Sequence, residues 1–496
     1  MTASVFSRPF GMTAGSSWRA ARRRLATAVL FTAIAAAPLP FGSRDPATLA
    51  FWCVLLGLAI TFAPLHGLGT AHHAILSGIA AIAAAYLVVL HEQLAGDPWI
   101  ATVHPIWAQA SAALGSRIEP SVSIARGEPL FALGAPLANM LALTLGLIVG
   151  TDRHDAHRAL RVLAWSGAAY ALYGIGALMI DPHAILWRVK TAYVGNLTAT
   201  FINRNTAATY FGSCAVVWLL LLLERARAER PLPATANWQA TLAAASERLL
   251  NPGRLLVPCV GLLLVVAALF LTVSRAGIVI SLFVLVSIAL LRLRERVRTP
   301  RHAVLAVAGA AVVGSLLVAI MGGGLGGRLH AQGISDDSRL ATWRSTLAMI
   351  SDRPWFGTGL GTFAWAYPHY RSDDLPLQGI WDAAHSTPLE LAAEAGLPLA
   401  GLIAAAWAAA IGVLAAACRN GSRGRVTPLA ALSIAVIALV HSSLDFSLQV
   451  AGYSIVCFAV VGVGLARACP TADRPDPAHA PGDARGRVAP VRPWDP

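Results

Sequence analysis

The stretch LLVPCVGLLLVVAALFLTVSRAGIVISLFVLVSIALL, residues 255–291, decides the fold class because it carries a single charged residue, Arg275. A membrane-spanning helix needs about 20 mostly apolar residues, so this run is too long for one span and long enough for two. An arginine at the bilayer centre costs about 2.5–3.5 kcal/mol, and far less at the boundary. The stretch therefore predicts two spans joined by a tight turn at Ser274 and Arg275, on the outer membrane face.

The composition of the whole chain agrees with a membrane protein. Hydrophobic residues make up 56% of the 496 residues and charged residues only 13%, whereas soluble domains carry about 25% charged residues. A soluble enzyme with a large core is therefore disfavoured. We expect an all-α integral membrane protein with about twelve transmembrane helices. The expected spans are 25–42, 47–64, 73–91, 130–150, 162–180, 206–223, 255–273, 276–291, 303–321, 397–417, 427–444 and 450–466.

The distribution of basic residues predicts the orientation of these spans. With the N-terminus inside, 26 of the 38 Lys and Arg residues fall in cytoplasmic segments, as expected for a chain that obeys the positive-inside rule. Arg22, Arg23 and Arg24 precede the first span, which we interpret as a retained signal-anchor. The net charge of +13 is thus assigned to topology and to contacts with the lipid bilayer, and no motif indicates a nucleic-acid partner.

The expected organisation follows from these spans. A cytoplasmic segment (1–24) precedes transmembrane helices 1–9 (25–321). A large, partly helical periplasmic loop (322–396) precedes transmembrane helices 10–12 (397–468), and a cytoplasmic tail (469–496), rich in Pro, Asp and Arg, is expected to be disordered. Two other outer connections, 92–129 and 181–205, are also long. Polar residues thus gather on one side of the membrane.

The large loop has local features of its own. Ser335 or Asp336 can cap a helix over about residues 337–351, which Arg353 and Pro354 end. Leu340, Trp343, Leu347 and Ile350 share one face of that helix. The glycine-rich PWFGTGLGTF that follows resembles a nucleotide-binding loop only superficially, since no strand precedes it and no helix obviously follows.

Three residues are predicted at one depth on the outer side: Arg204 at the mouth of the sixth span, Arg275, and His385 before the tenth span. Arginine stays charged and binds phosphate oxygens with a planar fork, so two of them suit a diphosphate. Histidine can accept a proton from an attacking hydroxyl. Position alone also allows simpler roles, in which the arginines anchor lipid headgroups and the histidine is structural.

Two further pairs have helical spacing. His441 and Asp445 lie four residues apart near the outer end of the eleventh span, where they can support the site from a second shell or simply hydrogen bond between helices. Glu390 and Glu394 also share a face. They can cap a helix or pair with arginines, and a catalytic role is the weaker alternative.

Six motifs in a fixed order carry a resemblance to a known family. They are FINRN (201–205), VSRAG (273–277), Arg339 with Trp343 in an R-x-x-x-W helix, DRPWFGTGLGTF (352–363), AHSTPLELAAEAGLPLAG (384–401) and HSSLDFSLQ (441–449). Together they resemble the bacterial O-antigen ligase superfamily, which includes lipopolysaccharide O-antigen ligases and related polysaccharide polymerases. The resemblance covers roughly residues 201–449.

The resemblance implies a glycosyltransferase of the bacterial inner membrane with its active site on the periplasmic side. Its members transfer a glycan from undecaprenyl diphosphate to an acceptor glycolipid or glycan, with no metal and no cofactor. By this resemblance Arg204 and Arg275 hold the donor diphosphate, Arg339 assists, and His385 is the base or orients the acceptor. Members often have an asparagine soon after the histidine, whereas Ser386, Thr387 and Pro388 stand here, so this chain departs from the family pattern where the acceptor contacts are expected.

Alternatives differ in what they require of the chain. A multi-span transporter is expected to place polar groups at mid-membrane, often within internal repeats, and here they collect at the rim without a visible repeat. A metal-dependent glycosyltransferase needs outward acidic residues arranged to hold a divalent ion, and nothing fixes such a site. Ligase and polymerase share the donor chemistry and differ in the acceptor. We favour O-antigen ligation to lipid A-core, with polymerisation as the alternative.

Overall fold

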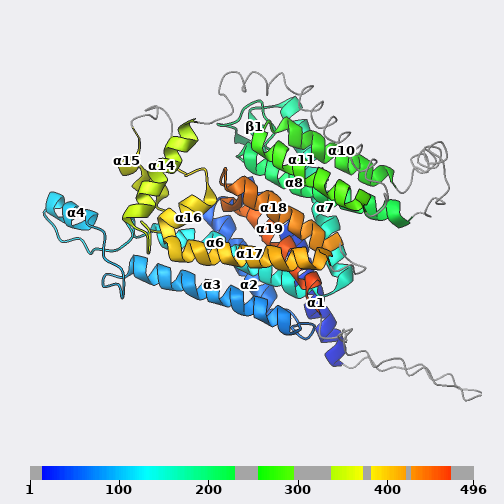
Figure 1. The fold of residues 1–496 in the computed structure, drawn as a ribbon, viewed down its shortest axis with the longest axis horizontal. Helices are drawn as coiled ribbons and strands as arrows, with labels where there is room; N and C mark the ends of the chain where they lie inside the picture. The colour runs from blue at the N-terminus through cyan, green and yellow to red at the C-terminus, as the bar shows by residue number, and fades with distance from the viewer. Residues whose placement is uncertain (1–13, 229–254, 295–336, 373–380, 420–425, 471–496) are drawn as a thin grey trace, which may run out of the picture.

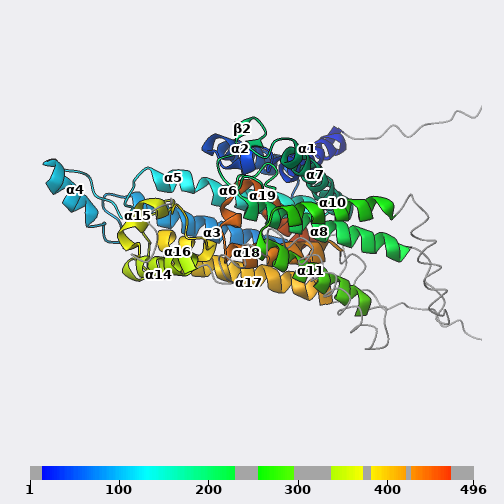
Figure 2. The same ribbon diagram turned by 90° about the horizontal axis from the view of Figure 1, so that it is seen from above.

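The computed structural model describes residues 14–228, 255–294, 337–372, 381–419 and 426–470. Within them the chain is helical apart from one short hairpin (Figures 1 and 2). The elements are α1 (Ala14–Ala36), η1 (Phe41–Ser43), α2 (Pro46–Phe62), α3 (Thr70–Leu94), α4 (Ile106–Leu114), α5 (Glu128–Ala132), α6 (Gly134–Gly150), α7 (Arg153–Ile180), β1 (Ala184–Ile185), β2 (Arg188–Val189), α8 (Arg204–Ala228), α10 (Leu256–Leu271), α11 (Arg275–Arg294), α14 (Asp337–Asp352), α15 (Phe363–Tyr370), α16 (Thr387–Ala395), α17 (Leu397–Arg419), α18 (Val426–Ser442), η2 (Ser447–Gln449) and α19 (Ala451–Ala468).

The helical class is confirmed, while the count of twelve spans is not shown. Seven helices of the described part are long and apolar enough to cross a membrane, so the chain has the character of a multi-pass membrane protein. They are α3, α5 with α6, α7, α8, α11, α17 and α19. Three further expected spans fall on the shorter apolar helices α2, α10 and α18, and the first falls on α1. The expected span 303–321 lies outside the described residues.

The break inside the long apolar run is where the sequence predicts it. Helix α10 ends at Leu271 and α11 begins at Arg275. Val273 in the connection has a positive φ of 55°, and the carbonyl of Leu271 accepts a hydrogen bond from the Leu197 N–H at 2.9 Å. The loop before α8 is therefore tied to the turn that presents Arg275.

Helices differ strongly in how much of their surface the protein covers. In α8 and α19, 83% of the apolar window is buried, whereas in α3 and α17 only 11% is buried. An apolar helix that the protein leaves uncovered faces lipid in a membrane. Thus α8 and α19 form the centre of the bundle, and α3 and α17, which pack against each other, face outward.

Small residues bring the central helices together at the end of the bundle where the long connections lie. A Cβ added at Gly277 of α11 would stand 2.5 Å from the Cβ of Ala208 on α8 and 3.5 Å from Nε2 of His441 on α18. Small side chains at such crossings let helix backbones approach closely. The first turns of α8 and α11 therefore lie side by side, next to the end of α18.

Helices α14, α15 and α16 form a cap on this end, with a separate apolar core that includes Met349, Phe363 and Tyr367 (Figure 1). Helix α14 confirms the helix predicted over 337–351. Its predicted apolar face was wrong in part, because Leu340 and Leu347 are exposed while Thr342, Ser345 and Met349 are buried. The cap thus covers the α14 face that carries small and polar residues.

The glycine-rich turn 352–363 holds the cap to the membrane helices. The Gln93 side chain of α3 donates to the carbonyls of Phe356 and Glu394, at 2.7 and 2.8 Å, and accepts from the Leu360 N–H. Gly357 has a positive φ of 66° and lies against the backbone of Glu394. Glycine is needed there because a side chain would meet the α16 backbone. A short helix, α15, does follow the turn, which corrects the sequence-based expectation.

Candidate functional site

Both predicted diphosphate ligands are the first residues of helices. Arg204 begins α8 and Arg275 begins α11. The side chain of Asn203 accepts a hydrogen bond from the Asn205 N–H at 2.6 Å, which fixes the start of α8. The first turn of a helix carries unsatisfied N–H groups and a partial positive charge, and so favours anions. At both places the partial positive charge of the helix start therefore adds to that of the arginine in attracting an anion.

Tyr193 connects Arg204 to the rest of the cluster. The Arg204 guanidinium carbon lies 5.3 Å from the centroid of the Tyr193 ring, within the range of a cation–π contact. Burial and the negative charge of Asp445 raise the pKa of Tyr193, while the charges of Arg204 and Arg339 oppose that rise. These groups are thus close enough to share one electrostatic field.

His385 precedes α16 and faces the end of α18. Its Nδ1 lies 3.5 Å from Oδ1 of Asp445, and its ring lies beside the rings of Trp381 and Phe446. The Asp445 side chain is 2% exposed and that of His385 is 25% exposed. With Nδ1 turned toward Asp445, Nε2 is the nitrogen left for a substrate. Catalytic hydrogen bonds are often long without substrate and shorten in the complex.

The carboxyl group of Asp445 is ionised despite its burial. Burial opposes the charge, but His385, His441 and Arg339 together hold the pKa of Asp445 below its usual range. A buried aspartate beside Nδ1 fixes the ring orientation and stabilises the imidazolium that forms when Nε2 accepts a proton. The His385–Asp445 pair therefore has the geometry of a base and its orienting carboxylate.

The peptide before His385 is held on both sides. The Ala384 N–H donates to Oε2 of Glu390 at 2.7 Å, and the Ala384 carbonyl accepts from the indole N–H of Trp343 at 3.1 Å. His385 itself has a positive φ of 52°, a conformation that is costly for a non-glycine residue unless its surroundings impose it. Trp343 and Glu390 impose it here, so they position the histidine.

Arg339 joins the cluster through the segment that follows α18. Its guanidinium donates to the carbonyl of Leu444 at 2.8 Å, next to Asp445. The predicted alternative role, bracing the loop helix through Asp336 or Asp337, falls on side chains outside the described residues. The structure thus places Arg339 beside the aspartate that faces His385.

The expectation that His441 and Asp445 share one helix face was wrong, whereas the alternative, a hydrogen bond between helices, is confirmed for His441. Helix α18 ends at Ser442, so Asp445 lies beyond it and turns toward His385. His441 instead hydrogen bonds through Nδ1 with Oγ1 of Thr209 on α8, at 2.7 Å, and with Oγ of Ser447, at 2.9 Å. His441 thereby links α18 to α8 next to the cluster. His441 and Asp445 thus both lie near the site.

Glu390 and Glu394 bind loop backbone and have no described ion pair with arginine. Oε1 of Glu394 accepts from the Phe363 N–H at 2.8 Å, as Glu390 does from Ala384. Burial and the charge of Glu394 raise the pKa of Glu390, and burial raises that of Glu394. A group whose folded-state pKa is raised stabilises the fold at low pH, and that stability is lost as the pH rises through the folded-state pKa.

We therefore expect the loop at His385 to loosen on the alkaline side of neutrality. The variant Glu390→Gln keeps an acceptor for the Ala384 N–H and removes the titration, so its melting temperature should fall less steeply with rising pH than that of the wild type. Glu390→Ala should destabilise the protein at every pH by about 1–3 kcal/mol, because it leaves a buried N–H unsatisfied. The assignment would be contradicted if the melting temperatures of wild type and Glu390→Gln fell equally steeply as the pH rises from neutral to alkaline.

Sequence reasoning missed three contributors to the site. Tyr193 lies in the connection before α8 and carried no motif signal. Trp343 belonged to a motif but was assigned to an apolar face, and its indole N–H instead reaches Ala384. Glu390 was predicted to cap a helix or to pair with an arginine. The signal available was the spacing of Glu390 five residues after His385, which suits a carboxyl group that folds back on the preceding loop.

The fold and the site define a class: a multi-pass membrane protein with arginines at helix starts and an aspartate-backed histidine. Comparison with family models then matches residues 260–404 to the O-antigen ligase family, so the chain carries a domain of that family and the resemblance is confirmed over this segment. The matched segment includes Arg275, Arg339 and His385, whereas Arg204, His441 and Asp445 lie outside it. No curated protein matches the chain.

Proposed function

We propose that this protein transfers a glycan from undecaprenyl diphosphate to an acceptor sugar on the periplasmic face of the bacterial inner membrane, as in O-antigen ligation to lipid A-core. The family domain supports lipid-linked glycan substrates in general. The observation that carries the specific reaction is His385, backed by buried Asp445 at 3.5 Å, with Arg339 bound to the neighbouring carbonyl of Leu444.

The proposed step is a displacement at the anomeric carbon of the donor. The acceptor hydroxyl oxygen forms the new glycosidic bond while its proton passes to Nε2 of His385. The bond between the anomeric carbon and the diphosphate oxygen breaks, and undecaprenyl diphosphate leaves with both electrons of that bond. Arg204 and Arg275, at the starts of α8 and α11, stabilise the negative charge on the leaving group.

Metal independence is part of this proposal. The described residues contain no group of three or more His, Cys, Asp or Glu side chains arranged to hold a metal ion. Positive charge at the diphosphate comes instead from arginine and helix ends. Transfer by the purified protein should therefore persist in the presence of a chelator, and chelator-sensitive transfer restored by a divalent ion would replace this mechanism with a metal-assisted one.

The lipopolysaccharide banding pattern of a deletion strain tests the proposal directly. If the whole long-chain ladder vanishes, lipid-linked polymer accumulates, and the wild-type gene restores the ladder, the protein is a ligase. If the ladder shrinks to single repeats, the acceptor is a growing glycan and the polymerase reaction replaces ligation. An unchanged ladder with normal lipid-linked intermediates would overturn ligation and direct attention to a secreted polysaccharide.

A further inference from the structure

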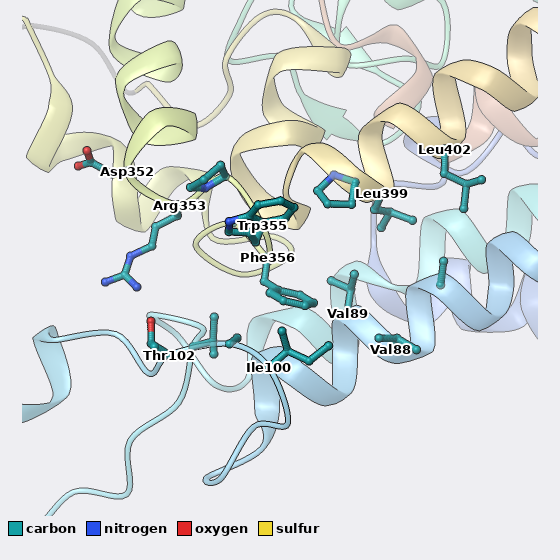
Figure 3. A pocket seen from close by; sticks show the side chains of 16 residues that line it. Val88, Val89, Ile100, Thr102, Asp352, Arg353, Trp355, Phe356, Leu399 and Leu402 are labelled. Carbon is teal, nitrogen blue, oxygen red and sulfur yellow. The ribbon is translucent and has the colours of Figure 1, made fainter.

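A groove separates the outer ends of two lipid-facing helices from the glycine-rich turn. Its volume is about 830 Å³, within the range of about 300–1,000 Å³ for ligand sites. Figure 3 shows Val88 and Val89 of α3 on one side, and Phe356 with Leu399 and Leu402 of α17 on the other. The walls are thus mostly apolar, with Thr102, Asp352 and Arg353 as polar lining residues.

The surroundings of the groove indicate contact with the bilayer. Helices α3 and α17 are only 11% buried in their apolar windows, and the groove lies where α3 ends and α17 begins. Trp355, which lines the groove, is 70% exposed, and nearby Trp99 is 73% exposed. Tryptophan is enriched where a membrane meets water. The groove therefore opens toward acyl chains at the level of the lipid headgroups.

One cation stands at the rim. Figure 3 shows the Arg353 side chain extending from the groove toward the segment that carries Thr102, while Asp352 points away. The Asp352 carboxylate accepts a hydrogen bond from the Tyr370 hydroxyl, and no side-chain hydrogen bond or ion pair of Arg353 forms within the described part of the chain. An apolar groove with an arginine at headgroup level complements a lipid that carries phosphate.

The groove and the first residues of α8 and α11, Arg204 and Arg275, lie on different sides of α17 and α18. Figure 1 shows α17 and α18 between α3 and the group α8, α10 and α11. The groove wall is joined to the C-terminal end of α16 by the hydrogen bond from the Thr358 N–H to the Ala393 carbonyl, 2.9 Å, and His385 precedes the other end. A helix of nine residues is about 14 Å long, which sets the separation between the groove wall and the start of α16.

We propose that this groove holds an acyl chain of the phosphorylated acceptor glycolipid, with its phosphate at Arg353. The assignment rests on the proposed function, because it requires donor and acceptor lipids to reach His385 from different sides. The donor diphosphate occupies the side of Arg204 and Arg275. The acceptor lipid enters between α3 and α17 and extends its sugars along α16 to Nε2 of His385.

Photo-crosslinking tests the site without requiring transfer. The full-length protein is reconstituted with a phosphorylated, acylated glycolipid that carries a diazirine in one acyl chain, and labelled peptides are mapped by mass spectrometry. We expect labels concentrated on residues 85–89 and 398–402 and resistant to excess phosphatidylglycerol. Labels spread over every lipid-facing helix, or removed by phosphatidylglycerol, would overturn the proposal, as would preferred labelling of the groove by a polyprenyl diphosphate probe.

Filling the groove provides a matched pair of variants. Leu402→Trp places an indole in the groove, and Val413→Trp places one on the same face of α17 about three turns deeper, where the exposure of 38% matches the 39% of Leu402. Leu402→Trp should lower groove labelling and raise the KM for the acceptor about tenfold, leaving the KM for the donor unchanged. Val413→Trp should change neither the labelling nor the acceptor KM.

Equal effects of both variants, or a raised donor KM alone, would overturn the assignment. If the proposed function itself is wrong, the wild type will show no transfer, while the labelling experiment still tests whether the groove binds the glycolipid.

Discussion

Replacing His385 with alanine should lower the rate of glycan transfer about 10²–10⁴-fold, the usual contribution of a positioned general base. The loss follows because Nε2 of His385 is the proton acceptor in the proposed step. The measurement is transfer of glycan from undecaprenyl diphosphate to the acceptor glycolipid by purified protein in vesicles. The melting temperature is compared in parallel, since the Ala384 peptide remains held by Trp343 and Glu390.

Two companion variants separate the chemical role of His385 from a structural one. His369→Ala removes an exposed histidine of the same cap and should leave transfer unchanged. Asp445→Asn keeps the size of the orienting group and removes its charge, so the imidazolium loses its stabilisation and the activity falls with a changed pH profile. Full activity of His385→Ala would remove the proposed base, and loss of activity in His369→Ala to the same degree would indicate a general effect on the cap.

Much of the fold could be predicted because membrane spans depend on local composition. The turn between α10 and α11 follows from one arginine in a long apolar run. It lies at residues 272–274, so Ser274 belongs to it as expected, whereas Arg275 is already the first residue of α11. The buried face of α14 could not be predicted from apolar periodicity. Within the cap α14 packs against α15 and α16, and Thr342 and Ser345 are buried, so burial there depends on tertiary partners and not on hydrophobicity.

The site was predictable as a set of residue types and only partly as a geometry. Arg204, Arg275 and His385 were expected at one depth because each stands next to a span boundary. The partner of His385 was not predicted, since the spacing of His441 and Asp445 indicates one helix face only while the helix continues. Helix α18 ends three residues before Asp445, and that ending frees the aspartate to face a loop distant in sequence. Tyr193 likewise reaches Arg204 through a fold of the chain that no local pattern encodes.

Replacing Arg275 with alanine should lower transfer about 10²–10³-fold, the usual cost of removing one group that stabilises developing negative charge. The expected effect is largest on kcat, because the charge on the diphosphate oxygen grows as the glycosidic bond breaks. Arg275→Lys should recover little of the rate. Lysine supplies a point charge, whereas the planar guanidinium binds two oxygens at once.

The controls for Arg275 use the chain's own arginines. Arg344→Ala removes an exposed cation from α14 and should leave kcat and both KM values unchanged, which excludes a general effect of net charge. Arg204→Ala should resemble Arg275→Ala, and the double variant should lose less than the product of the two single effects, because both cations act on one diphosphate. Strictly multiplicative losses would place the two arginines on separate groups. Full activity of Arg275→Ala in correctly inserted protein would mean that this arginine only anchors the helix end at the membrane surface, the role its position alone allows.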